Sequence, residues 1–115
     1  MPRGRVLAGA TVGSWADDYL RERREVLLRT IGIAASVALR AGHGDLAAQL
    51  AAIGLDEDPW GERLHQLAVH ACMARDDLDA ARRAMRRCVS ALDELAMRPE
   101  DATADLAYDL GIQLQ

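Results

Sequence analysis

The stretch Leu55–Trp60 constrains the fold more than any other, because it separates two alanine-rich segments of helical pattern. Proline lacks a backbone N–H, fixes its own φ and pushes the preceding residue out of the α region, so a helix has to end before Pro59. The same proline suits the first turn of a new helix, and Asp58 can cap that turn. The Asp58–Pro59 pair therefore predicts the joint between two pairs of helices.

The composition predicts that all of the regular structure is helical. Half of the 115 residues are hydrophobic, but the chain has two Trp, two Tyr and no Phe, so the core has to be built from aliphatic residues and alanine. Alanine is the strongest helix former, and its small side chain lets helices approach closely. Runs of β-branched and aromatic residues, which are typical of strands, are missing. We therefore expect an all-α fold.

Start and stop signals divide the chain into about five helices. Residues 1–13 contain Arg3, Arg5 and three glycines and are predicted to form an irregular N-terminal arm, followed by a helical domain over residues 14–115. The expected helices run from Ser14 to the glycine turn at 42–44, from Asp45 to Gly54, from Pro59 to Ala74, from Asp76 or Asp77 to Arg98, and from Pro99 to about Leu110.

One of these helices carries a clear core pattern. Its apolar residues alternate steps of three and four, as in a heptad seam: Leu78, Ala81, Met85, Cys88, Leu92 and Leu95. We expect this seam to be buried.

An internal repeat indicates how the helices are paired. The sequence Asp45-Leu46-x-Ala48 recurs as Asp77-Leu78-x-Ala80, 32 positions later, each time at the start of the second helix of a pair. The Leu-x-x-Asp-Pro ending at 55–59 resembles the close of a tetratricopeptide-type repeat. The repeat therefore predicts tetratricopeptide-like antiparallel helix pairs.

A larger set of residues resembles the bacterial transcriptional activator domain. The set comprises Asp58-Pro59-x-x-Glu62, Asp77-x-x-x-Ala81, and Arg86-Arg87-Cys88-x-x-x-Leu92-x-Glu94-Leu95-x-x-x-Pro99-x-x-x-Thr103-x-x-Leu106, with Trp15 and an arginine cluster ahead of them. The resemblance covers residues 15 to 110 and is more specific in its C-terminal half. Two positions depart from it, since Met85 stands where the family usually has tyrosine, and Ala96 where glycine is common.

The resemblance implies a helical module of a bacterial transcription activator that mediates dimerisation or protein–protein contacts. Family members carry a winged-helix DNA-binding domain ahead of this module, and here only the thirteen-residue arm precedes Trp15. We therefore expect a fragment or a short relative that does not itself read DNA sequence. The alternative hypothesis is a stand-alone tetratricopeptide-like scaffold that binds proteins unrelated to transcription.

Charge and motifs argue against several other classes. The net charge of −4 does not favour a nucleic-acid-binding surface over the whole domain. No apolar run reaches the length of a membrane span. Cys72 and Cys88 lie in helical patterns, and we expect them to be small apolar residues of a protein in the reducing cytoplasm. His65, His70, Cys72 and Cys88 lack the paired spacing of a zinc site, so we expect no metal and no cofactor. Nucleophile and phosphate-loop motifs are absent from the sequence, and we expect no enzymatic activity.

Two groups of residues are candidates for partner binding. Arg82, Arg83, Arg86 and Arg87 flank the seam, and they form either a basic patch for an acidic partner or, as we favour, a solvated flank that covers the seam with its stems. Trp15 and Tyr19 lie on one side of the first helix with Val26 and Ile33, and Trp15, like Trp60, is either an interface residue or, as we favour, a packing residue.

Because helix pairs expose an apolar edge until a neighbour covers it, we expect a homodimer through the side of the first helix near Trp15 and Tyr19. The alternative is a monomer in which the last helix or the arm covers that side.

Overall fold

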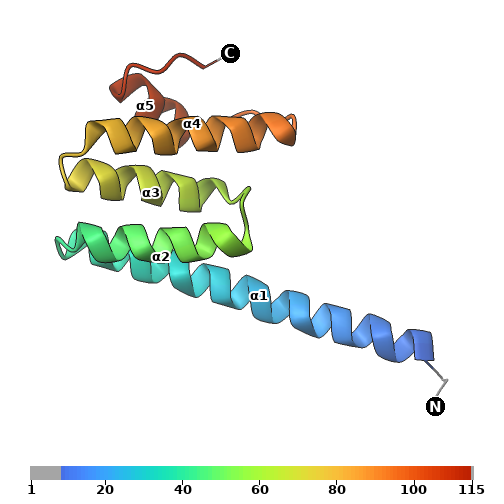
Figure 1. Cartoon of the computed structure of the whole chain (residues 1–115). Coiled ribbons are helices and arrows are strands. Elements are labelled where there is room, and N and C mark those ends of the chain that lie inside the picture. Colours follow the sequence, from blue (N-terminus) through green and yellow to red (C-terminus); the bar gives the residue numbers. More distant parts are fainter. Residues whose placement is uncertain (1–8, 115) are drawn as a thin grey trace. The chain divides into compact units, whose positions relative to one another are not determined.

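The computed structural model describes residues 9–114. Within this range the chain forms five α-helices and no strand (Figure 1): α1 Gly9–Arg40, α2 Gly44–Glu57, α3 Glu62–Ala74, α4 Leu78–Glu94 and α5 Asp101–Asp109. The prediction of an all-α fold with about five helices is confirmed.

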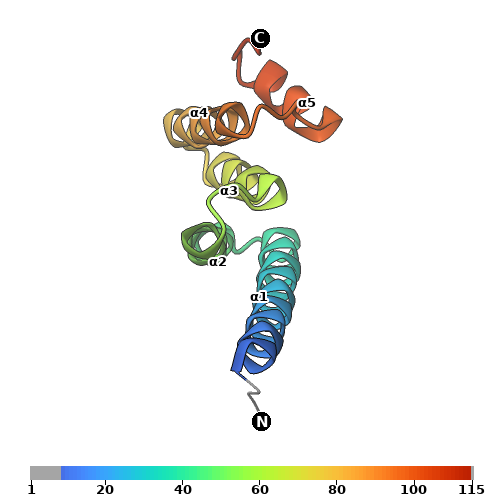
Figure 2. The ribbon, with the colours of Figure 1, turned by 90° about the vertical axis from the view of Figure 1, so that its right-hand side faces the viewer.

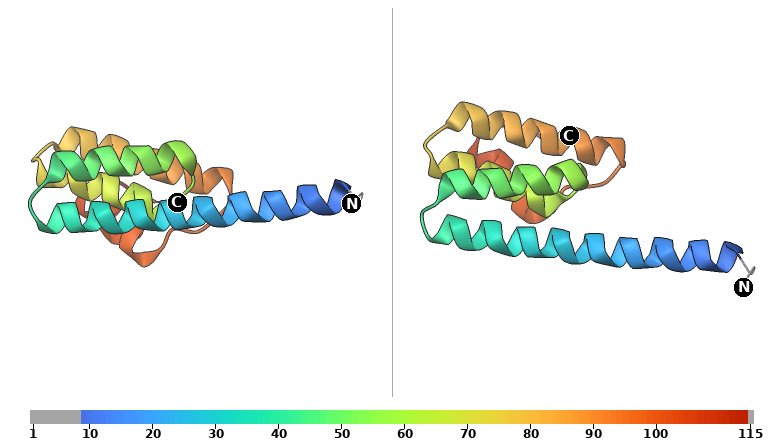
Figure 3. Two further views of the ribbon diagram at one scale, coloured as in Figure 1. Left: turned by 90° about the horizontal axis from the view of Figure 1, so that it is seen from below. Right: turned by 60° about the horizontal axis from the view of Figure 1, so that its bottom comes forward.

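The chain separates into two compact units, Met1–Thr30 and Ile31–Gln115. In the described part of the first unit, residues 9–30 are helical throughout. In the second unit α3 packs against both α2 and α4, and α5 packs against α3 and α4. The chain reverses direction between successive helices from α2 to α4 (Figure 3), as expected for antiparallel pairs. In the end-on view, α2 and α4 are displaced to the same side of α3 (Figure 2).

The largest core cluster lies where α3, α4 and α5 meet. It consists of Val69, Ala81, Ala84, Met85, Cys88, Leu92, Leu106, Ala107 and Leu110. The middle of the predicted seam on α4 is therefore confirmed. Its ends are not, since Leu78 is 48% exposed and Leu95 46% exposed. Leu78 is the first residue of α4, and Leu95 is its C-cap residue.

A second, smaller cluster joins the end of α1 to α2 and α3 through Ala38, Ala47 and Ala71. Gly54 also belongs to this contact, and its predicted role as the end of a helix is wrong. The helix α2 continues to Glu57, and Gly54 is buried in it. A Cβ at Gly54 would lie 2.8 Å from Cδ2 of Leu64, so the glycine permits close packing of α2 against α3.

The predicted starts of α1 and α2 differ from those in the structure. The helix α1 begins at Gly9, so Ser14 lies inside it, and residues 1–8 of the predicted arm lie outside the described residues. Residues of capping type are tolerated inside a helix, and Ser14 did not force a boundary. The residue before α2 is His43, and Asp45 lies in the first turn, where its charge suits the positive end of the helix dipole.

The joint at Asp58–Pro59 is present, but it is a turn rather than the first turn of a helix. An oxygen of Asp58 accepts a hydrogen bond from the Trp60 N–H at 3.3 Å, and its carbonyl accepts one from the Gly61 N–H at 3.2 Å. The helix α3 then begins at Glu62. The carboxylate of Asp58 thus stabilises the turn, whereas Asp77 caps α4 as predicted by accepting from the Ala80 N–H at 3.1 Å.

The backbone conformation after α4 explains why glycine is common in the family at the position of Ala96. The N–H of Met97 bonds to the carbonyl of Leu92, and the N–H of Ala96 to that of Asp93, which is the Schellman arrangement. This arrangement places Ala96 at φ +53°, in the left-handed region that favours glycine. The glycine expected from the family resemblance thus has a conformational reason.

Candidate functional site

A groove of about 520 Å³ lies over α3, between α2 and α4. We call it the α2–α4 groove. It is lined by Ala48, Ala52, Leu55, Asp56, Pro59, His65, Ala68, Cys72, Arg87, Ser90, Ala91 and Glu94. Because α2 and α4 are displaced to the same side of α3 (Figure 2), they form its two walls and α3 forms its floor.

The groove exists because its lining side chains are short. Ala48 and Ala52 belong to one wall, Ala91 to the other, and Ala68 to the floor. A side chain that ends at Cβ leaves the space that a leucine would fill, and it lets a further helix approach closely. Concave, mainly apolar surfaces with a few polar groups are typical of binding sites.

The charges of the groove are separated along its length. Asp56 and Glu94 line it near the C-terminal ends of α2 and α4, and Arg87 lines it two turns earlier on α4. The carboxylate of Glu94 accepts a hydrogen bond from Nε1 of Trp60 at 3.0 Å. Because the C-terminal ends of helices carry partial negative charge, the end of the groove at Glu94 favours a cation.

His65 and Cys72 contribute the polar atoms of the floor. His65 is 5% exposed, and its Nε2 lies 2.8 Å from the carbonyl oxygen of Pro59. Since a carbonyl only accepts, Nε2 carries the proton of this bond, which ties α3 to the preceding turn. Within residues 9–114, no three His, Cys, Asp or Glu side chains come together in a way that could hold a metal ion.

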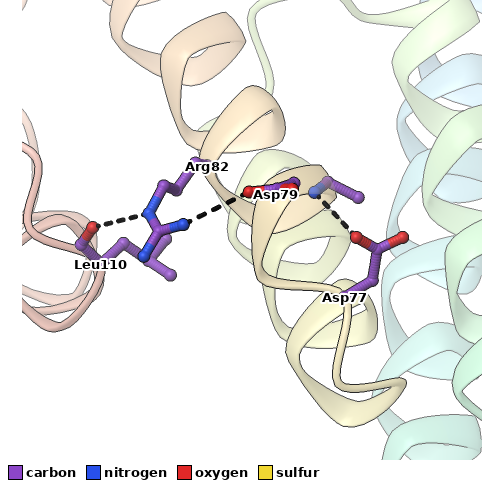
Figure 4. A network of polar contacts seen from close by, with 5 residues as sticks. Asp77, Asp79, Arg82 and Leu110 are labelled. Atoms are coloured by element: carbon purple, nitrogen blue, oxygen red, sulfur yellow. Dashed lines mark hydrogen bonds and ion pairs between the residues drawn. The ribbon is translucent and has the colours of Figure 1, made fainter.

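The four arginines of α4 do not form one patch. Nε of Arg82 donates to the carbonyl of Leu110 at 3.2 Å, and its Nη1 lies 3.4 Å from a carboxylate oxygen of Asp79 (Figure 4). Arg82 thus connects α4 to the end of α5. Arg83 and Arg86 are exposed, and Arg87 faces the α2–α4 groove. Spacing along the helix could not distinguish these roles, because they depend on where α2 and α5 pack.

The aromatic candidates on α1 are exposed. Trp15 is 68% exposed and Tyr19 47% exposed, and their rings stack with centroids 5.8 Å apart. The guanidinium of Arg23 lies over the Tyr19 ring and donates to its hydroxyl at 3.0 Å. The favoured interpretation of Trp15 as a packing residue is therefore wrong for the described part of the chain. Trp60 is also 45% exposed, with its indole N–H bound to Glu94.

Sequence reasoning missed a polar network between α3 and α5. One carboxylate oxygen of Glu62 accepts from the N–H of Glu100 at 2.7 Å and from the hydroxyl of Thr103 at 2.5 Å. The buried Gln66 donates to Glu100 and Thr103 at 3.0 and 2.9 Å. Glu62 and Thr103 both belong to the motif that resembles the family, but their separation of 41 residues gave no sign that they touch.

The network lies beside Cys88 and affects its acidity. Burial, with the charges of Glu62 and Glu100 as smaller contributions, raises the pKa of the Cys88 thiol to about 11, and a hydrogen bond with Thr103 opposes this rise. Cys88 is therefore protonated at neutral pH and packs as an apolar group. We expect no nucleophilic chemistry from it.

Comparison with known proteins gives one family. The model of the bacterial transcriptional activator domain matches residues 2–110, nearly the whole chain. Neither the curated proteins nor the solved structures gave a match. Among residues 9–114, none of the helices combines the length and apolar character that crossing a membrane requires.

Proposed function

The chain belongs to the bacterial transcriptional activator domain family, and we propose that it is the protein-interaction module of a cytoplasmic transcription activator. On this proposal it contacts proteins, either a second copy of itself or the transcription machinery, and carries out no catalysis. It also does not read DNA sequence itself.

The observation that supports this proposal most directly is the α2–α4 groove. Its alanine-lined walls suit an inserted helix, and its separated charges suit a partner with a defined polarity. The exposed Trp15–Tyr19 pair provides a second surface of interface type. In contrast, the arginines of α4 are divided between an internal contact, the groove and the solvent, which does not favour a continuous surface for nucleic-acid phosphates.

A reporter assay tests the proposed function. The chain is fused to an unrelated bacterial DNA-binding domain, and transcription is measured from a promoter that carries that domain's operator. We expect transcription above that given by the DNA-binding domain alone. We also expect the gain to be lost when Ala52→Arg fills the groove, and to be kept when the exposed Arg83→Ala leaves it open. A fusion that folds but never raises transcription contradicts the proposal.

DNA binding by the chain itself is tested separately by fluorescence anisotropy at physiological salt. We expect weak binding that falls with added salt and does not depend on the duplex sequence, because sequence-independent binding is electrostatic. Tight binding to one duplex, and not to its scrambled version, contradicts the proposal.

The stand-alone scaffold remains the second candidate, since the same groove serves either role. It is favoured if the groove variants lose a protein partner but leave the reporter unchanged.

A further inference from the structure

The charges on the groove face of α4 form a self-complementary pattern. Arg87 and Glu94 are seven residues apart, so they lie two turns from each other on the same face, and both line the groove. Ser90 and Ala91 lie between them on that face. When such a helix is placed antiparallel to a copy of itself, Arg87 of each copy faces Glu94 of the other.

We propose that a second copy of this chain occupies the α2–α4 groove, with α4 of each copy inserted antiparallel between α2 and α4 of the other. This inference rests on the proposed interaction function and names the partner and the surface. The contact is isologous, because a twofold axis near Ser90 and Ala91 relates the two copies and each surface meets its own equivalent.

The shape of the groove agrees with this arrangement. The helices α2 and α4 form two ridges over α3, so two copies can interdigitate with the helices in the order α2, partner α4, α4, partner α2. The side chains at the centre of the contact are small, namely Ala52, Ala68, Ser90 and Ala91. Small residues let helix axes approach to about 8 Å. The antiparallel placement also brings the positive end of each α4 dipole next to the negative end of the other, which is favourable.

The electrostatics agree as well. In the part of the chain that the structure describes, the Arg87 side chain makes no hydrogen bond or ion pair. In the dimer this guanidinium would reach Glu94 on α4 of the partner. Its planar fork suits carboxylates. The bond from Trp60 to Oε1 of Glu94 fixes that side chain and leaves the second carboxylate oxygen for the partner.

The Trp15–Tyr19 face of α1 lies outside the proposed contact. That face was the expected dimer surface, and its stacked rings and Arg23 are exposed. The guanidinium of Arg23 lies over the Tyr19 ring on this face. A dimer through α1 is therefore the principal alternative outcome of the test.

Sedimentation equilibrium of the full chain at micromolar concentrations tests the proposal, with circular dichroism to confirm that each variant is folded. We expect a dimer, weakened by about tenfold or more in Arg87→Glu, because reversal of a paired interface charge leaves like charges facing each other. Glu94→Arg weakens it too, and the double variant R87E/E94R recovers most of the loss. Arg83→Glu, which changes an exposed charge of the same helix outside the groove, leaves the dimer intact.

Three results overturn the inference. The first is a monomer at every concentration. The second is a dimer that persists in both single variants. The third is a dimer that is lost in Trp15→Ser and kept in Arg87→Glu, which assigns the contact to α1. The reporter assay separates this failure from failure of the proposed function. A monomeric chain that activates transcription overturns the dimer alone, and a dimer that never activates overturns the proposed function alone.

Discussion

The carboxylate of Glu62 at the start of α3 accepts a hydrogen bond from the hydroxyl of Thr103 in α5, across 41 residues of sequence. The same oxygen accepts from the backbone N–H of Glu100, the residue that precedes α5. Glu62 therefore ties the start of α3 to the start of α5. This contact fixes α5 over the core formed by Met85, Cys88 and Leu92.

Removal of the charge of Glu62 is predicted to loosen α5. Glu62→Gln keeps the size of the side chain but weakens two hydrogen bonds to a carboxylate, each worth about 1.5–3 kcal/mol at most. We expect the free energy of unfolding to fall by about 1–3 kcal/mol in urea denaturation. Asp105→Asn, an exposed carboxylate of α5, is the matched control and should change little. An unchanged midpoint for Glu62→Gln would show that the network does not hold α5.

The left-handed residue after α4 predicts a stabilising substitution. Ala96 has φ +53°, a conformation that costs a residue with a Cβ about 1–2 kcal/mol. Ala96→Gly is expected to raise the free energy of unfolding by about 1 kcal/mol, since glycine relieves this cost but loses some chain entropy. Ala102→Gly, at an exposed helical position of α5, should instead lower it by about 0.5–1 kcal/mol. The prediction fails if both glycines destabilise the domain equally.

The burial of Leu92 predicts a large packing effect. Leu92→Ala removes a side chain that is 2% exposed in the main core, which typically costs about 2–5 kcal/mol. Leu95→Ala, at the exposed C-cap position of α4, should cost much less. Thermal and urea denaturation of the two variants provide the comparison. Equal losses would mean that the C-terminal turn of α4 is covered.

The sequence predicted the interior of the helices better than their ends. The heptad pattern of α4 identified Ala81, Met85, Cys88 and Leu92 as core, because a helix repeats its buried face every few residues. The predicted helix ends were wrong where a residue can take either of two structural roles. Gly54 can stop a helix or permit close packing, Asp58 can cap a helix or a turn, and the fold around each residue decides between them.

The candidate site was less predictable than the fold. The α2–α4 groove is lined by residues from three helices, many of them alanines that signal only helix propensity in the sequence. Arg87 was singled out with Arg82, Arg83 and Arg86, but its position in the groove depends on how α4 packs against α3. Trp15 and Tyr19 were identified as partner-binding candidates, and both are exposed.

The acidity of Cys88 predicts a pH dependence in the alkaline range. The pKa of this thiol is raised from 9.0 to about 11 in the folded protein, mainly by burial. The raised pKa means that the folded state keeps a proton that the unfolded state releases, so this contribution to stability is complete below about pH 9 and is lost as the pH rises towards about 11. Urea denaturation between those pH values should show stability falling less steeply in Cys88→Ala than in the unchanged chain. Parallel slopes would contradict the prediction.

The claim that partners cover the α2–α4 groove is tested most directly by the reactivity of Cys72. This thiol is partly buried in the floor of the groove, whereas Cys88 is buried in the core. The rate of Cys72 labelling by an aromatic disulfide reagent is measured at increasing protein concentration, with labelling sites identified by mass spectrometry. We predict that the rate falls as the unchanged chain associates and stays constant in Arg87→Glu. A Cys72 rate that does not change while the chain associates would show that the groove stays open, and would contradict the account.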